Sequence, residues 1–330
     1  MLKKAVWAVG TVVILITLFL IFVWHNPSPI QSQTRFLMDT FCTIQVPGDV
    51  EVIPAIEHAF ERIEEIENKF NALNPDSPVY AFNNFNTPIE DEEIVNLIQT
   101  ALKISTISGG KFDITVFSLI DLWGFYGDNP KVPDKQPLNE VLETVGFENL
   151  VVSDNKITKK RADTKIDLGS IAKGYSIREA IKVLENEEIT SALIDTGGDI
   201  YAMGTNYGKP WAIGIRNPRG EGVVGILDLS DISVVTSGDY ERVFEENGKK
   251  YHHILDPETG FPALGMASVT VIAPDPALAD GWSTAFFVLG VEKTMEIIKE
   301  LESIEVFLIT DTGKKIYSNG MEVERKTIEK

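Results

Sequence analysis

The chain has 330 residues, of which 44% are hydrophobic, and it carries a formal net charge of −19 at pH 7. Because such an acidic surface repels polyanions, these numbers exclude nucleic acid and anionic lipid surfaces as partners. The single cysteine, Cys42, excludes an internal disulfide, and we interpret it as a small buried hydrophobe.

Residues 1–24 are predicted to form an N-terminal signal anchor, a single transmembrane helix. Lys3 and Lys4 precede a run without charged residues from Ala5 to Trp24, and a helix of that length extends about 30 Å, the thickness of a bilayer core. The flanking lysines predict a single-pass protein of the cell membrane whose remaining chain lies on the extracytoplasmic face. A cleaved secretion signal is the alternative, although no convincing cleavage site follows the apolar run.

Residues 25–33 contain Pro and Ser and are nearly uncharged, so we predict a short tether there. Residues 34–330 are long enough to bury a substantial core, as one large domain or two intimately packed ones. The first elements predicted in this region are a strand at 35–46, amphipathic helices at 52–70 and 91–108, and a loop at 71–86.

Residues 111–126 form a mostly apolar stretch that contains Asp113 and Asp121. A buried carboxylate is rarely left without a partner, and the simplest interpretation is that each one bonds a neighbouring backbone group. A short helix near 140–145 and a hairpin at 150–159 are predicted to follow.

Residues 165–185 predict a strand that ends at Asp167, then a Gly/Ser turn, then the start of a helix. Such a junction directs unpaired backbone N–H groups at whatever lies before it, so anions often bind there. Gly169 and Gly174 permit close approach of the backbone. Many α/β connections share this pattern, and it is neither a Walker loop nor a dinucleotide fingerprint.

From residue 190 onward, short β-rich segments dominate the chain. Strands are predicted at 192–195, 200–203, 211–216, 223–229, 232–236 and 268–273, a hairpin at 242–254 that turns at Asn247-Gly248, two helices between 280 and 301, and a last hairpin about 311–313. This mixture predicts an α/β (α+β) fold with a mixed, largely antiparallel sheet and helices packed against it.

The stretch from Thr236 to Thr284 brings several reactive residue types together. His252 and His253 are adjacent in a chain with only four histidines, and Asp280 stands four residues before Thr284. On a helix the oxygens of Asp280 and Thr284 would project from one face, which a hard cation could use. The residues alone leave open a metal-histidine site, or a helix cap beside a packed hydroxyl.

Seven ordered motifs carry a resemblance to a known family. They are MDT at 38–40, FDITVFSLIDLWGF at 112–125, DLGSIAKGY at 167–175, DTGGDIYAMG at 195–204, TSGDYER at 236–242, HHILDPETGFPA at 252–263 and ADGWST at 279–284. The chain resembles the ApbE family of FAD:protein FMN transferases, and the match covers nearly everything after the tether. The resemblance implies one ApbE-like (T-fold-like) flavin transferase domain over residues 34–330.

The resemblance also implies an activity and a set of site residues. The enzyme would use magnesium to split FAD, join its FMN half to a threonine of an acceptor flavoprotein, and release AMP. The implied metal ligands are Asp280, Thr284 and the main-chain carbonyl of Ser170. The implied FAD contacts are Met38, Lys111, Phe112, Asp113, Asp167, Lys173 and Ile254. Hard oxygen ligands suit magnesium, which would neutralise pyrophosphate oxygens beside the turn at 167–174.

The two histidines are candidates for proton transfer. Phosphoryl transfer to a hydroxyl profits from a nearby base, and the unperturbed pKa of histidine, about 6.5, suits that role. Because side chains alternate along a strand, one ring should face the site and the other should face away. We predict His253 as the base, with His252 as the alternative and a purely structural pair as the third interpretation.

Leu73 departs from the family pattern. Many members have an aromatic residue there, at a place expected to lie against the flavin, and stacking weakens without the ring. Tyr80 or Phe82 are candidates to replace it. The departure leaves two alternative functions open, namely an FAD pyrophosphatase that yields FMN and AMP, and a non-catalytic membrane-tethered flavin-binding protein.

Overall fold

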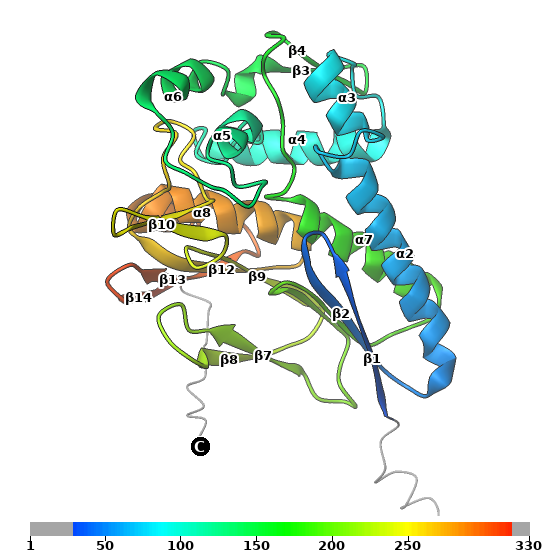
Figure 1. Ribbon diagram of the computed structural model, residues 1–330. Helices are drawn as coiled ribbons and strands as arrows, with labels where there is room; N and C mark the ends of the chain where they lie inside the picture. Colours follow the sequence, from blue (N-terminus) through cyan, green and yellow to red (C-terminus); the bar gives the residue numbers. More distant parts are fainter. Residues whose placement is uncertain (1–28, 319–330) are drawn as a thin grey trace, which may run out of the picture.

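An eight-stranded antiparallel sheet forms the centre of the computed structural model, which describes residues 29–318 (Figure 1). The strands follow the order β1-β2-β5-β6-β9-β12-β13-β14, and each neighbouring pair is antiparallel. They are β1 (Ile30–Leu37), β2 (Thr40–Pro47), β5 (Ala192–Thr196), β6 (Asp199–Met203), β9 (Ile232–Gly238), β12 (Met266–Ala273), β13 (Glu305–Thr310) and β14 (Lys315–Tyr317). The predicted antiparallel sheet is therefore confirmed.

Three separate hairpins surround this sheet. They are β3 (Leu150–Ser153) with β4 (Lys156–Lys159), β7 (Trp211–Arg216) with β8 (Val223–Leu229), and β10 (Val243–Glu246) with β11 (Lys249–His252). The predicted turn at Asn247-Gly248 is confirmed, because both residues have the positive φ angles, 53° and 75°, that a tight two-residue hairpin turn requires.

Helices cover one face of the sheet, as predicted, and the β7–β8 hairpin covers the other (Figure 1). The helices are α2 (Ile53–Phe70), α3 (Pro78–Phe85), α4 (Glu92–Ile107), α5 (Phe117–Leu122), α6 (Lys135–Leu142), α7 (Ala172–Asn186) and α8 (Pro276–Ile297), with short 3₁₀ turns η1 (Val50–Val52) and η2 (Phe147–Asn149). Because both faces are covered, β12 is buried along its whole length. Cys42 is also fully buried, as predicted.

Several boundaries differ from the sequence predictions. The single strand predicted at 35–46 is instead a hairpin, which turns at Met38-Asp39 with φ angles of 55° and 58°. Its first strand begins at Ile30, inside the predicted tether. The predicted loop at 71–86 contains α3, because the Ser77 hydroxyl caps the helix by accepting a hydrogen bond from the Tyr80 N–H.

The two helices predicted after residue 280 form one element, α8, which bends at Gly290 (φ 72°, ψ −177°). The predicted anchor at 1–24 and residues 25–28 of the predicted tether lie outside the described residues. Within residues 29–318, no helix combines the length and the apolar character that crossing a membrane requires.

Candidate active site

The site begins where the start of α7 meets the first turns of α8. The backbone N–H of Gly174 donates to Asp280 Oδ2 at 2.9 Å, and Asp280 is only 2% exposed. A Cβ atom on Gly174 would lie 2.1 Å from the Pro276 carbonyl oxygen, so only glycine permits this approach. The contact joins the turn at 167–174 to α8, across 106 residues of sequence.

The Ser170 carbonyl lies just before α7 and is available to a ligand. Gly174 is the third residue of α7, where backbone N–H groups have no acceptor inside the helix, and its N–H donates to Asp280. The Ser170 oxygen accepts no hydrogen bond from residues 29–318. The contact joins the segment that carries this carbonyl to the helix that carries Asp280, and both oxygens are donors that magnesium accepts.

Lys173 supplies a positive charge beside Asp280. Its Nζ atom forms a close ion pair with Asp199 and lies 3.6 Å from Asp280 Oδ1. Burial opposes the lysine charge, but the two carboxylates outweigh burial and raise the pKa of Lys173. Glu241 also interacts with Lys173, and burial raises the pKa of Glu241. Arg216 and Arg242 also act on Glu241, so Lys173 is chiefly balanced by Asp199 and Asp280.

Thr284 lies at one end of a chain of hydroxyl groups. The Ser283 hydroxyl donates to the Asp280 carbonyl oxygen at 2.8 Å, so it has no proton left for Ser237, whose Oγ is 2.8 Å away. Ser237 therefore donates to Ser283 and can accept a hydrogen bond from Thr284, at 3.4 Å. With its proton directed at Ser237, Thr284 keeps its lone pairs for a cation.

The two histidine rings have different partners. His253 Nδ1 donates to the Glu241 carbonyl oxygen at 3.1 Å, whereas His252 Nε2 donates to the Ala263 carbonyl oxygen at 3.0 Å. Burial, and then the positive charge of Arg242, lower the pKa of His253 to about 3. Burial lowers the pKa of His252 as well. Both rings are therefore neutral near pH 7, and Nε2 of His253 is an unprotonated acceptor.

The low pKa of His253 predicts a specific loss of stability in acid. Below about pH 6.5 the unfolded chain protonates this histidine and the folded protein does not, so stability falls as the pH falls from about 6.5 toward 3. Between pH 7 and pH 5, the free energy of unfolding measured in urea is expected to fall by about 2 kcal/mol more for the wild type than for His253→Gln. The matched control is His58→Gln, because the His58 ring lies at the surface beside Glu187. Parallel pH curves for wild type and His253→Gln would contradict the prediction.

The other expected FAD contacts fall into two groups. Phe112 and Asp113 are buried and used by the fold itself, because Asp113 accepts hydrogen bonds from the Thr115 N–H at 2.7 Å and the Phe147 N–H at 2.8 Å. This confirms the simplest interpretation of Asp113. Ile254 is likewise buried, and its carbonyl oxygen accepts from the Ala263 N–H.

Met38, Lys111 and Asp167 lie nearer the surface. Lys111 Nζ bonds Asp256 Oδ1 at 2.9 Å, so it holds the motif that follows the histidines. Asp167 accepts hydrogen bonds from the Tyr126 hydroxyl and from the N–H of Gly169. Met38 occupies the turn between β1 and β2.

Sequence reasoning missed four residues of this site. Asp199, Glu241 and Ser237 stand inside the quoted motifs DTGGD and TSGDYER, and Tyr126 directly follows the motif at 112–125. Their partners lie 26 to 68 residues away in the sequence, which no local pattern reveals. Within the described residues, no three His, Cys, Asp or Glu side chains form a metal site by themselves. The ligand set that the resemblance implies combines one carboxylate, one hydroxyl and one carbonyl.

Solved structures with this fold include flavin transferases. The ApbE protein of Thermotoga maritima superimposes with a TM-score of 0.83 and 35% identity, over 88% of this chain and 97% of that one. The flavin transferase ApbE of Vibrio cholerae gives a TM-score of 0.79 and 28% identity, over 88% and 98%. By its fold and site, the chain falls in the class of flavin transferases.

Sequence comparison gives the family. The FAD:protein FMN transferase of Treponema pallidum is 34% identical over 303 residues, which cover 84% of each chain. That of Haemophilus influenzae is 34% identical over 299 residues, 84% of this chain and 86% of the relative. The model of the ApbE family matches residues 38–308. The chain belongs to the ApbE family.

Proposed function

We propose that this enzyme transfers FMN from FAD to a threonine side chain of an acceptor flavoprotein, requires Mg²⁺, and releases AMP. The observation that supports the proposal is the contact between Gly174 and Asp280, which holds Asp280 against the start of α7 and beside Lys173. The relatives named FAD:protein FMN transferase support the reaction. Magnesium, when bound, would neutralise the pyrophosphate oxygens of FAD.

Each group of the proposed site would have a separate role in the transfer reaction. Asp280, Thr284 and the Ser170 carbonyl would hold the metal, and the Lys173 ammonium would attract the pyrophosphate. His253 Nε2 would accept the proton of the threonine hydroxyl as its oxygen bonds to the FMN phosphorus. The phosphoanhydride bond breaks in the same step, and the electron pair leaves with AMP.

An acceptor assay tests the proposed function directly. The protein is incubated with FAD, Mg²⁺ and a threonine-bearing acceptor domain that a curated relative flavinylates. We expect a fluorescent acceptor band and one AMP per flavin attached, and neither product with EDTA. An acceptor whose target threonine is replaced by alanine is the control. Release of AMP without a labelled acceptor band would contradict the proposal that FMN is transferred to the acceptor.

FAD hydrolysis is the second candidate function, and one observation favours it. Leu73 is 48% exposed and stands where many family members carry an aromatic ring. Weak stacking would shorten the life of bound FAD and let water replace the acceptor hydroxyl. The same assay decides, because hydrolysis yields free FMN and AMP at equal rates with and without acceptor. A non-catalytic flavin-binding protein would release no AMP.

We further propose that residues 1–24 anchor the enzyme in the cell membrane, with residues 34–330 on the extracytoplasmic face. The apolar run and the two lysines before it support this orientation. Protease added to intact spheroplasts is expected to digest the catalytic domain. Its protection until the membrane is lysed would refute the orientation.

Replacement of His253 by alanine is expected to slow FMN transfer by about 10²- to 10⁴-fold, the usual contribution of a positioned base. FAD affinity, measured by fluorescence quenching, should stay within about twofold. His58→Ala is the matched control, because that ring lies at the surface beside Glu187. Full transfer activity in His253→Ala would rule out the base role.

Replacement of Ser237 by alanine is expected to weaken metal binding without changing the ligands. Thr284 then loses the acceptor for its proton, and a lost hydrogen bond of about 1 kcal/mol lowers affinity roughly fivefold. Titration with Mn²⁺ followed by electron paramagnetic resonance measures this affinity without turnover. Thr236→Ala is the control, because that hydroxyl bonds Thr270. Equal Mn²⁺ affinity would show that Ser237 does not orient Thr284.

A further inference from the structure

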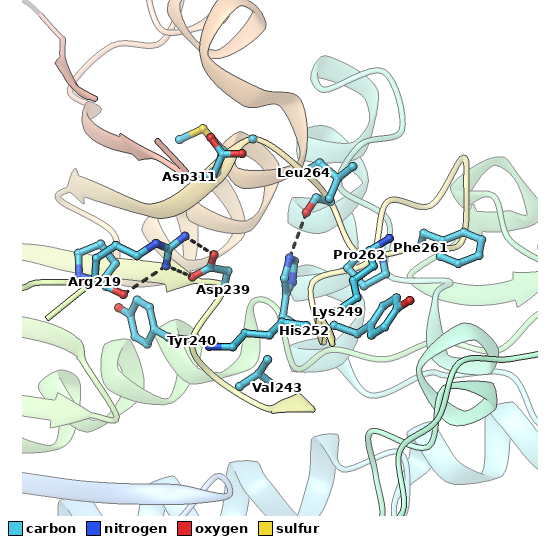
Figure 2. Close-up of a pocket in the computed structure, with 16 residues that line it drawn as sticks. Arg219, Asp239, Tyr240, Val243, Lys249, His252, Phe261, Pro262, Leu264 and Asp311 are labelled. Atoms are coloured by element: carbon cyan, nitrogen blue, oxygen red, sulfur yellow. Dashed lines mark hydrogen bonds and ion pairs between the residues drawn. The ribbon is translucent and has the colours of Figure 1, made fainter. Parts of the chain in front are cut away.

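A groove lies on the other side of the histidine pair from the proposed transfer site. It has a volume of about 840 Å³ and is formed by the β10–β11 hairpin, the segment 261–266 and residues 239–240. Figure 2 shows His252 between the Arg219–Asp239 pair and the side chains of Pro262 and Leu264. None of the expected FAD or metal contacts lines this groove.

Residues that line the groove are adjacent in sequence to residues of the proposed transfer site. His252 lines the groove, whereas the next residue, His253, bonds the Glu241 carbonyl. Asp239 and Tyr240 also line the groove, and Glu241, which directly follows them, interacts with Lys173. A chain bound in the groove therefore lies close to the place where the phosphorus would be attacked.

The groove is lined in part by exposed apolar side chains. Leu264, Val243 and Phe261 remain 80%, 42% and 39% exposed. Solvent-exposed apolar side chains gathered around a hollow are typical of interaction sites. His252 is only 8% exposed, and its Nδ1, which has no hydrogen-bond partner within residues 29–318, is itself buried.

The groove is lined by Arg219, Lys249 and Lys250 and by Asp239 and Asp311, a local charge of +1 in a chain that is otherwise strongly acidic. Lys249 and Lys250 stand opposite Glu246 and Glu245 in the hairpin but take part in no salt bridge among the described residues; Lys249 lies over the Tyr251 ring. Arg219 is neutralised by Asp239 through two hydrogen bonds of 2.7 and 2.6 Å. Against a total charge of −19, these two lysines mark a face that an acidic partner could approach.

We propose that this groove binds an extended, acidic segment of the acceptor protein and thereby selects which protein receives FMN. The proposal rests on the proposed function, because only a transferase needs a protein to dock beside its base. The lysines would attract the acidic side chains, and Leu264 and Val243 would pack against apolar ones. Bound in this way, the acceptor would hold its threonine-bearing segment next to the residues that flank His253.

The test compares two double charge reversals. Lys249→Glu with Lys250→Glu changes the groove, and Lys103→Glu with Lys299→Glu makes the same change of charge on exposed side chains outside it. We expect kcat/KM for transfer to the acceptor domain to fall at least about tenfold in the groove variant and less than twofold in the control. FAD affinity and acceptor-independent FAD hydrolysis should stay unchanged in both.

Two further measurements keep the result interpretable. Leu264→Asp removes apolar contact from a side chain that is 80% exposed, so the fold should tolerate it, and transfer should again fall while FAD affinity holds. Anisotropy of the fluorescein-labelled acceptor domain, without FAD, should show tighter binding to wild type than to either groove variant. This readout remains valid if the wild type proves unable to transfer FMN.

Three results would overturn the proposal. The first is transfer at the wild-type rate by both groove variants. The second is an equal loss of transfer and of acceptor-independent hydrolysis, which would show that the groove serves FAD. The third is anisotropy that does not distinguish the groove variants from wild type.

Discussion

The Asp280→Asn variant is expected to lose more than about 100-fold in FMN transfer while remaining folded. Replacing a residue that hydrogen-bonds to a metal ligand typically lowers metal affinity or activity by about 10- to 100-fold, so replacing a ligand itself should lower them more. Asparagine keeps the shape and the oxygen that accepts from Gly174, but it removes the charge. Steady-state transfer at saturating Mg²⁺, with Mn²⁺ affinity measured separately, checks this expectation.

The matched control is Asp275→Asn, five residues earlier on the same helix. Asp275 accepts hydrogen bonds from the N–H of Ala277 at the start of α8, and asparagine caps helices equally well. Transfer by this variant should stay near the wild-type rate. If Asp280→Asn retains transfer and Mn²⁺ affinity, the metal must bind elsewhere, and the proposed ligand set is wrong.

Gly174→Ala is expected to destabilise the protein and to disrupt the proposed metal site. The new Cβ would meet the Pro276 carbonyl oxygen at 2.1 Å and the Asp280 Cβ at 2.8 Å, and neither backbone nor a buried carboxylate can move cheaply. Separating α7 from α8 should cost about 3 kcal/mol of unfolding free energy. It should also weaken Mn²⁺ binding, because Asp280 moves away from Ser170. Thermal denaturation and Mn²⁺ titration measure the two effects.

Gly281→Ala is the control that distinguishes the effect of steric crowding on stability from the effect of a displaced Asp280 on metal binding. Its Cβ would also be too close to a neighbour, at 2.5 Å, but that neighbour is the terminal methyl of Ile104, which can rotate. We expect a smaller loss of stability and unchanged Mn²⁺ affinity. Similar effects of both substitutions would mean that α8 tolerates displacement and that the Gly174 contact does not set the site geometry.

Local patterns predicted most of the secondary structure because the signals lie within single elements. The helical spacing of Ile56, Phe60 and Ile63 gave α2, and Asn247-Gly248 fixed the β10–β11 hairpin. The hairpin turn at Met38-Asp39 was missed because neither residue is a glycine, although both adopt positive φ angles. Such a conformation is imposed by contacts outside the turn, which a sequence window does not contain.

The site was predicted less completely than the fold. The resemblance supplied Asp280 and Ser170, and the structure brings their chain segments together. Composition and spacing alone could not have paired Lys173 with Asp199, because that ion pair depends on how α7 packs against β6. Asp113 shows the opposite case, since its partners two residues away made a backbone interpretation sufficient.

The Gly174–Asp280 contact has a consequence for how the enzyme matures. The two residues are 106 positions apart, so they meet only after the intervening strands have paired, and long-range contacts of this kind form late in folding. With the proposed metal ligands, a chain that is still emerging or only partly folded would have no place to hold the metal. Capture of the ion would then mark the end of folding, and the bound ion would in turn stabilise the completed protein.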